Sequence, residues 1–303
     1  MALGNQRKLR VIGVPTDLGQ GRRGVDMGPS AIRYAGLSEK MRELGYEIED
    51  LGNVDVPPAE SRVQGSEKVK YLQQVKEVSD ELRLMVRDTL RDHYLPIVLG
   101  GDHSAAIGSI AGAVEAMGNL GCIWFDAHGD MNTPETTPSG NIHGMPLAVS
   151  LGLGHPDLIN LGGIHPKLKP ENVVLVGIRS IDGEERKLIH EMGVQVFTMH
   201  EVDEMGISAV MHQAIEIATK GTNGVHLSVD LDGIDPMFAP GVGTPVNGGI
   251  TYREGHLAME ILAAANCVTS VDFVEVNPIL DKQNATGKLT VELASSLFGL
   301  TVI

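Results

Sequence analysis

The chain has 303 residues, of which 42% are apolar and 21% charged, as is usual for a globular protein with a sizeable core. Its formal net charge of −15 excludes a general nucleic-acid binder and favours metal ions or a cationic small substrate as partners. No run approaches the ~18 apolar residues of a membrane span, and two cysteines make neither a disulfide framework nor a thiolate zinc site, which together favour a cytoplasmic protein.

Short apolar runs followed by longer helix-like stretches recur along the chain. Strands are predicted over residues 10–14, 96–99, 121–125, 172–178, 195–198, 225–229 and 270–276. Helices are predicted over residues 66–90, 104–117, 183–191, 207–219, 251–265 and 291–298. Strands that alternate with helices indicate a parallel sheet covered by helices on both faces. Because no linker or repeat divides the chain, we expect one α/β domain over residues 1–303.

Acidic residues follow four of the predicted strands, and two of these acidic tracts also contain histidine. The carboxyl ends of parallel strands meet at one edge of the sheet, where such folds bind their ligands. Alternate residues of an extended chain project to the same side, so each tract can present a row of ligands to one point. The candidate metal ligands are His103, Asp126, His128, Asp130, Asp230 and Asp232. Asp102 and Asp235 are expected to support the ligands or to form turns, and not to bind metal themselves.

Four converging carboxylates require a counter-charge. Two carboxylates about 4 Å apart repel by roughly 4 kcal/mol at an effective dielectric near 20. The summed repulsion of several such pairs is comparable to the whole free energy of unfolding of a domain, roughly 5–15 kcal/mol. Oxygen-rich ligation with some imidazole suits Mn²⁺, with Co²⁺ as a possible substitute. Two such ions activate a bridging water, so the pattern predicts a binuclear metallohydrolase. Each tract taken alone is equally compatible with an ordinary charged turn.

The same residues resemble the ureohydrolase family and, within it, the arginases. The similarity runs from residues 13–15 and 19–25, through the metal tracts and residues 132–144, to residues 243–245 and 275–278. It implies a single domain with a mainly parallel eight-stranded sheet, assembled as a homo-oligomer, a trimer or a hexamer. It also implies a cytoplasmic enzyme of arginine metabolism and the urea cycle. Such an enzyme uses two Mn²⁺ per subunit to convert L-arginine and water to L-ornithine and urea.

The resemblance further implies a role for each ligand. It gives one manganese the ligands His103, Asp126, Asp130 and Asp230, and the other Asp126, His128, Asp230 and Asp232, so that two of these aspartates bridge. The hydroxide between the ions attacks the guanidinium carbon of the substrate. Asp130 passes its proton to the departing nitrogen, and His143 resembles a proton shuttle. Glu275 can hold the planar guanidinium through paired hydrogen bonds.

The remaining implied roles concern the amino-acid end of the substrate. The residues that resemble the holders of the α-carboxylate are Asn132, Thr137, Ser139 and Asn141. Asp182, with Glu185 nearby, resembles a reader of the α-ammonium, although Ser180 departs from the pattern at a position where some arginases carry an aspartate. Thr244 resembles a residue that contacts the metal-bound water or the substrate.

Two other functions stay open at this stage. An agmatinase or another guanidino-compound hydrolase shares the metal tracts but needs no side chains for an α-carboxylate. A catalytically silent, metal-binding regulatory subunit is expected to lack some site residue, whereas every ligand position and Glu275 are present. A Rossmann dinucleotide site is excluded, because no Gly-x-Gly-x-x-Gly turn follows the first strand.

Overall fold

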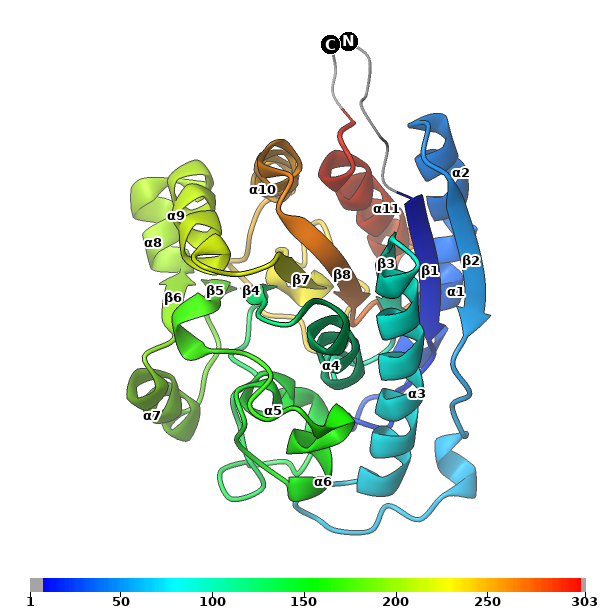
Figure 1. Cartoon of the computed structure of the whole chain (residues 1–303), viewed down its shortest axis with the longest axis vertical. Helices are drawn as coiled ribbons and strands as arrows, with labels where there is room; N and C mark the ends of the chain where they lie inside the picture. Colours follow the sequence, from blue (N-terminus) through cyan, green and yellow to red (C-terminus); the bar gives the residue numbers. More distant parts are fainter. Residues whose placement is uncertain (1–7, 301–303) are drawn as a thin grey trace.

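One sheet of eight parallel strands organises residues 8–300, the part of the chain that the computed structural model describes (Figure 1). The strand order is β2-β1-β3-β8-β7-β4-β5-β6. The strands are β1 (Lys8–Val14), β2 (Ile48–Asn53), β3 (Tyr94–Gly100), β4 (Gly121–Phe125), β5 (Val173–Ile178), β6 (Gln195–Thr198), β7 (Val225–Asp230) and β8 (Val268–Val274). The predicted α/β class with a parallel sheet is thereby confirmed.

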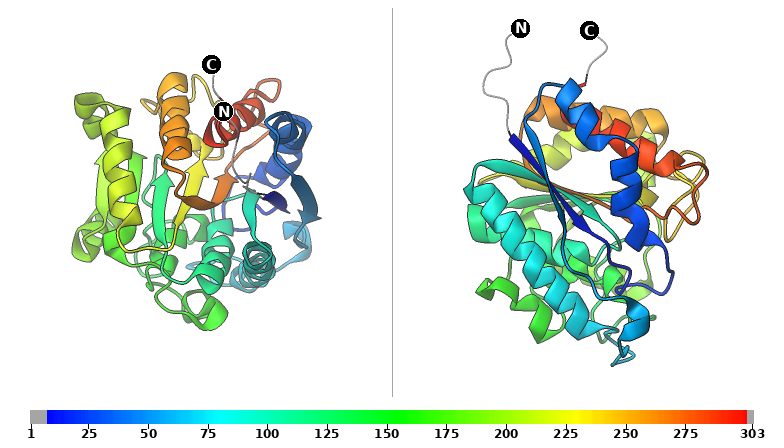
Figure 2. Two further views of the ribbon diagram at one scale, coloured as in Figure 1. Left: turned by 45° about the horizontal axis from the view of Figure 1, so that its top comes forward. Right: turned by 90° about the vertical axis from the view of Figure 1, so that its right-hand side faces the viewer.

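Helices cover both faces of this sheet, as Figure 2 makes plain. The helices are α1 (Gly28–Tyr34), α2 (Leu37–Glu43), α3 (Leu72–Arg91), α4 (Ala105–Met117), α5 (Pro146–Ser150), α6 (Pro156–Ile159), α7 (Gly183–Met192), α8 (Met199–Met205), α9 (Ile207–Thr219), α10 (Tyr252–Ala265) and α11 (Ala285–Leu297). Helices α3, α4, α5 and α7 contribute to the core on one face, and α1, α2 and α8–α11 contribute to the core on the other. None of the helices within residues 8–300 is both long and apolar enough to cross a membrane.

Strand β4 illustrates why the sequences of the central strands are unbroken apolar runs. All five of its residues are buried. Cys122 and Trp124 enter the core beneath α3 and α4, whereas Ile123 and Phe125 enter the opposite core. Because both faces of a parallel sheet are covered, successive side chains are apolar on both sides.

The short helices α1, α2, α5, α6 and α8 were not predicted, and three further details of the expected secondary structure are wrong. Strand β2 was not predicted, because this edge strand pairs only with β1 and carries four exposed residues instead of an apolar run. The helix expected over residues 66–90 begins at Leu72, after Tyr71 with a left-handed φ of 54°. The last helix begins at Ala285 rather than at residue 291, because small and polar residues fill its first turns.

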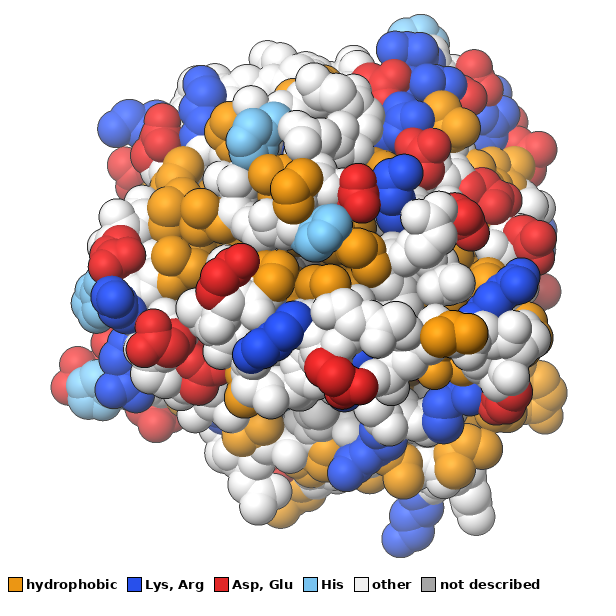
Figure 3. Space-filling view, turned by 90° about the horizontal axis from the view of Figure 1, so that it is seen from below, with side chains coloured by type: hydrophobic (Ala, Val, Ile, Leu, Met, Phe, Trp, Pro, Cys, Tyr) orange, Lys and Arg blue, Asp and Glu red, His pale blue; other side chains and the backbone are white. Residues whose placement is uncertain are grey.

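The strand order determines where the site residues meet. Strands β3 and β4 follow each other in the chain, yet β8 and β7 lie between them in the sheet. The four strands that precede the acidic tracts are therefore the four central neighbours β3, β8, β7 and β4. On the face of the molecule at their carboxyl ends, Lys and Arg side chains are interspersed with acidic and hydrophobic ones (Figure 3).

Candidate metal centre

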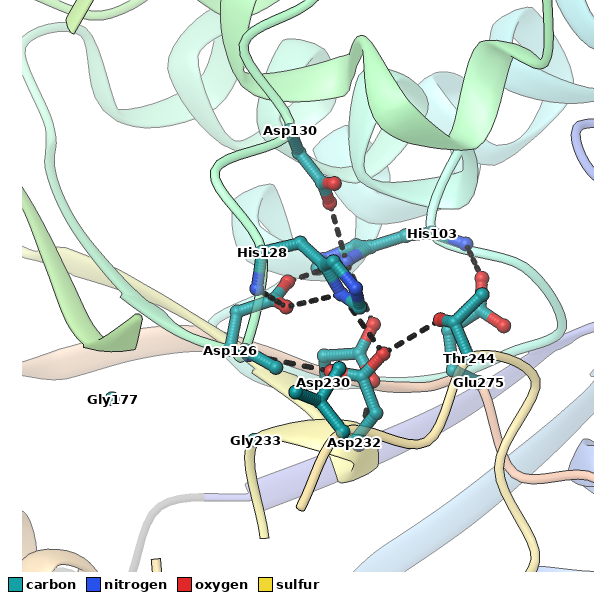
Figure 4. A network of polar contacts seen from close by, with 12 residues as sticks. His103, Asp126, His128, Asp130, Gly177, Asp230, Asp232, Gly233, Thr244 and Glu275 are labelled. Atoms are coloured by element: carbon teal, nitrogen blue, oxygen red, sulfur yellow. Dashed lines mark hydrogen bonds and ion pairs between the residues drawn. The ribbon is translucent and has the colours of Figure 1, made fainter. Parts of the chain in front are cut away.

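Two groups of ligand atoms, buried except for those of the half-buried His128, meet beyond the carboxyl ends of β3, β4 and β7 (Figure 4). His103, Asp126 and Asp230 form one group, and Asp126, His128 and Asp232 form the other. Within each group the ligand atoms lie within 4.8 Å of one another. Asp126 belongs to both, so the structure offers two adjacent cation sites that share a carboxylate.

The ring of His103 faces three carboxylates at nearly equal distances. Its Nδ1 atom lies 3.2 Å from Asp126 Oδ2, 3.0 Å from Asp130 Oδ2 and 3.1 Å from Asp230 Oδ2. This Nδ1 is buried and has no well-formed hydrogen bond within the described chain. Adjacent ligands of an octahedral ion bound at roughly 2.1 Å lie about 3 Å apart. The spacing around His103 therefore fits a set of ligands that converge on one cation.

The second group has a similar arrangement around His128. The Nδ1 atom of His128 lies 3.1 Å from Asp232 Oδ2 and 3.5 Å from Asp126 Oδ1. Asp126 thus turns its Oδ1 atom toward one histidine and its Oδ2 atom toward the other. A carboxylate that presents one oxygen to each site has the geometry of a bridging ligand.

The electrostatics of the cluster call for added positive charge. Burial, reinforced by the charges of Asp232 and Asp126, raises the pKa of Asp230 well above its usual range. Burial and the charge of Asp126 raise the pKa of Asp130 to about 6. Burial lowers the pKa of His128, but the charges of Asp232 and Asp126 outweigh it and raise this pKa to about 12. Without cations these carboxylates must share protons, which is the behaviour of a site built for divalent ions.

Several supporting residues escaped the sequence analysis. Trp124 Nε1 donates to Asp126 Oδ2 over 3.0 Å, and its ring stacks on that of His103 with centroids 4.2 Å apart. Ser228 Oγ lies 2.8 Å from His103 Nε2. Each of these two residues stands two positions before a ligand on a buried strand, so alternation along β4 and β7 was the available signal.

Glu275 lies beside the ligands, immediately after β8. Its side chain is 1% exposed, and its backbone adopts a left-handed φ of 65°. Its Oε1 atom accepts a hydrogen bond from the backbone N–H of His103 over 2.9 Å and lies 3.1 Å from His143 Nδ1. Burial lowers the pKa of His143, but the hydrogen bond and charge of Glu275 raise it to about 9. A strained backbone that holds a buried carboxylate is typical of a functional site.

Comparison with known proteins agrees with this geometry, since the model of the Arginase family matches residues 7–299. The chain belongs to the arginase family. It is 56% identical over 294 residues to an arginase of Bacillus caldovelox, covering 97% of this chain and 98% of that protein. The crystal structure of native B. caldovelox arginase superposes with a TM-score of 0.96 at 55% identity, covering 98% and 100% of the two chains. The crystal structure of Entamoeba histolytica arginase with L-ornithine superposes with a TM-score of 0.90 at 36% identity, covering 97% of this chain and 99% of that one.

These matches confirm the resemblance identified from the motifs and the prediction that the chain is an enzyme of the arginase family. They also agree with the eight-stranded sheet that the resemblance implies.

A cavity of about 130 Å³ lies next to the side chains predicted to bind metal. Its walls include three of the predicted substrate-binding residues, Asn132, Glu185 and Thr244. Thr244 Oγ1 also donates to Asp232 Oδ2 over 2.8 Å. The full lining is His103, His128, Asp130, Asn132, His143, Gly144, Glu185, Asp230 and Thr244.

The other five predicted substrate-binding residues lie outside this lining: Glu275, described above, and Thr137, Ser139, Asn141 and Asp182. Thr137 is buried and accepts from the N–H of Gly140, and Ser139 Oγ accepts from the N–H of Asn141. Asp182 caps the N-terminus of α7 and accepts from Asn132 Nδ2 over 2.9 Å. The structure thus links Asp182 to the cavity through Asn132, and the roles of all five of these outlying residues in substrate binding stay predictions.

Asp102 and Asp235 belong to neither ligand group. Asp102 accepts hydrogen bonds from the N–H groups of Gly19 and Ser104, and Asp235 accepts from those of Gly248 and Gly249. Both residues therefore shape the loops around the site.

Proposed function

We propose that the protein hydrolyses L-arginine to L-ornithine and urea at this site with two Mn²⁺ ions per subunit. The observation that carries the proposal is the buried carboxylate of Glu275 next to two ligand groups that share Asp126. An anion that can take paired N–H donors suits a guanidinium, which stays protonated at any ordinary pH. The similarity to an arginase of B. caldovelox, and the L-ornithine in the crystal of the E. histolytica arginase, point to the same substrate.

The donor set supports the choice of metal. Four carboxylates with two imidazoles favour Mn²⁺, and Co²⁺ is a possible substitute. When bound, such cations lower the pKa of water toward neutrality and hold it for attack. The residues that would hold them are His103, Asp126, Asp130 and Asp230 for one ion and Asp126, His128, Asp230 and Asp232 for the other.

The protein's own side chains bind the substrate and move protons. Glu275 orients the guanidinium so that its carbon faces the ligand groups. Asp130, whose Oδ2 atom lies 3.0 Å from His103 Nδ1 at the ligand groups, can accept a proton and return it to the departing nitrogen. His143, whose pKa of about 9 keeps it protonated at neutral pH, holds a proton at the Nδ1 atom that faces Glu275. It can supply that proton to the leaving group and recover one from solvent.

Selection of the amino-acid end falls to the segment after Asp130. Neutral hydrogen-bond donors in Asn132, Thr137, Ser139 and Asn141 would hold an α-carboxylate without demanding a counter-charge. Asp182 and Glu185 would hold the α-ammonium, and Thr244 stands at the cavity wall beside Asp232. A substrate that lacks the α-carboxylate, such as agmatine, gains nothing from this segment.

The test is urea release from L-arginine and from agmatine by chelated protein reloaded with Mn²⁺, Co²⁺ or no metal. We expect arginine-selective release that Mn²⁺ restores best. Faster release from agmatine would keep the metal site but overturn the proposed substrate. No urea from either compound, with two ions bound per chain, would replace the proposal by a catalytically silent metal-binding subunit.

We further infer a cytoplasmic homo-oligomer, a trimer or hexamer, in which residues 1–303 of each protomer form one domain. The lack of a linker or repeat in the sequence supports a single domain, and the resemblance to arginases implies the homo-oligomer. The reaction would belong to arginine metabolism and the urea cycle. Light scattering coupled to size exclusion measures the number of protomers, and limited proteolysis measures whether the chain divides.

A further inference from the structure

The Gly19-Gln20-Gly21 segment, in the loop after β1, brings a buried amide to the site. Its backbone is tied to two other loops, because Gly19 N–H donates to Asp102 Oδ2 over 2.8 Å and Gly19 C=O accepts from His143 N–H over 2.9 Å. A third tie comes from Arg22, whose Nη1 atom donates to the carbonyl of Gly243 over 2.8 Å. The loop therefore holds the Gln20 side chain, which is only 6% exposed, in a defined place.

The orientation of the Gln20 amide follows from its neighbour. Its Nε2 atom lies 3.1 Å from Glu275 Oε2. An ionised carboxylate only accepts hydrogen bonds, so the NH₂ end of the amide must face it. This orientation leaves Gln20 Oε1 buried and without a hydrogen-bond partner among residues 8–300. Since an unmet buried acceptor costs free energy, the pairing with Glu275 decides how the amide is turned.

Gln20 completes a set of donors around the Glu275 carboxylate. Oε1 receives the backbone N–H of His103 and faces His143 Nδ1, whereas Oε2 receives, among residues 8–300, only the amide of Gln20. Gly243 closes the remaining side, because a Cβ there would lie 2.5 Å from Glu275 Oε2 and 2.9 Å from Gln20 Oε1. Without Gln20, the carboxylate would be held at one oxygen and free to rotate about its terminal torsion.

We propose that Gln20 is a positioning residue that fixes the plane of the Glu275 carboxylate and so sets how the guanidinium group of the substrate is held. The inference rests on the proposed function, in which Glu275 holds the guanidinium. A planar, paired contact depends on the orientation of the carboxylate, and small errors of placement at a reacting centre are costly. Gln20 thereby acts on the guanidinium end of the substrate and leaves the amino-acid end untouched.

The experiment compares Gln20→Leu with the wild type and with Gln73→Leu. Gln73 is a matched control, because its Nε2 donates to Glu77 in an exposed pair on α3 and it belongs neither to the ligand groups nor to the cavity lining. We expect Gln20→Leu to lower kcat/KM for L-arginine about ten- to a hundredfold, since a charged acceptor loses its donor. Its KM should rise, while the inhibition constant of L-ornithine, which has no guanidinium, and the content of metal should stay within twofold of wild type.

A second comparison asks whether Gln20 acts through Glu275. In a Glu275→Gln background, where position 275 has no charge to orient, adding Gln20→Leu should slow the residual urea release by less than twofold. Wild-type kinetics in Gln20→Leu would overturn the inference. Equal losses for L-arginine turnover and L-ornithine binding would also overturn it, by showing a general structural defect. If the wild type prefers agmatine, the proposed substrate fails, but the same comparison made with agmatine still decides the role of Gln20.

Discussion

Replacing Ser228 by alanine removes the hydrogen-bond partner of the His103 Nε2 atom. Ser228 is fully buried, and its Oγ atom lies 2.8 Å from His103 Nε2. Because Nδ1 faces the carboxylates of the metal site, Nε2 carries the proton and donates it to Ser228. The alanine variant leaves a buried N–H unsatisfied, which costs about 1–3 kcal/mol. At 1.4 kcal/mol per decade this matches the ~10–100-fold loss of metal affinity typical of such supporting residues.

Calorimetric titration of chelated protein with Mn²⁺ measures this loss, and Ser270→Ala is the matched control. Ser270 is also a buried serine 2.8 Å from a histidine nitrogen, Nδ1 of His226, but that histidine belongs to neither ligand group. We expect both variants to unfold at lower temperature than wild type and only Ser228→Ala to bind Mn²⁺ more weakly. Equal Mn²⁺ affinities in the two variants would refute the reasoning that Ser228 orients a ligand.

Three further predictions concern charge at the same site. Removing the ions should lower the melting temperature by about 4 °C for each site that had been filled to about 100 Kd. Calorimetric scans before and after reloading with Mn²⁺ measure this shift, and an unchanged melting temperature would argue against these ligands. Asp130→Asn should reduce the rate of urea release by several decades, because the amide keeps a ligand oxygen but cannot transfer the proton. Metal analysis should still find two ions per chain. Near-normal turnover would contradict this role of Asp130. Because the folded-state pKa of His143 is raised to about 9, its ion pair with Glu275 stabilises the metal-free protein fully below about pH 6.5 and is lost as pH rises through 9. The difference in melting temperature between wild type and His143→Asn should therefore shrink over that range, and a difference that grows instead would reverse the sign of the argument.

The convergence of the acidic tracts is foreseeable from the sequence for a physical reason. Parallel strands end at one edge of the sheet, so residues that directly follow Phe125 and Val229 must meet wherever those strands are neighbours. The edge strand β2 is not foreseeable, because its residues are largely exposed and lack the apolar pattern of a buried strand.

Contacts across the sheet are equally hidden in the sequence. The contact between His103 and Ser228 depends on β8 being inserted between β3 and β7, which the order of the elements along the chain does not reveal. The bond from Gln20 to Glu275 spans 255 positions and joins two loops whose motifs look independent. The motifs identify the chemical groups that each loop carries. They do not show which loops hydrogen-bond to one another in the folded protein.

The insertion of β8 and β7 between β3 and β4 also has a consequence for biosynthesis. As the chain leaves the ribosome, His103 and the residues up to Asp130 emerge well before β7 and β8 are made. At that moment the nascent chain carries four of its six ligands without the central strands that bring them together. The full set of six ligands therefore exists only after β7 has been made, and a polypeptide that ends before Val225 keeps the first four ligands but lacks Asp230 and Asp232.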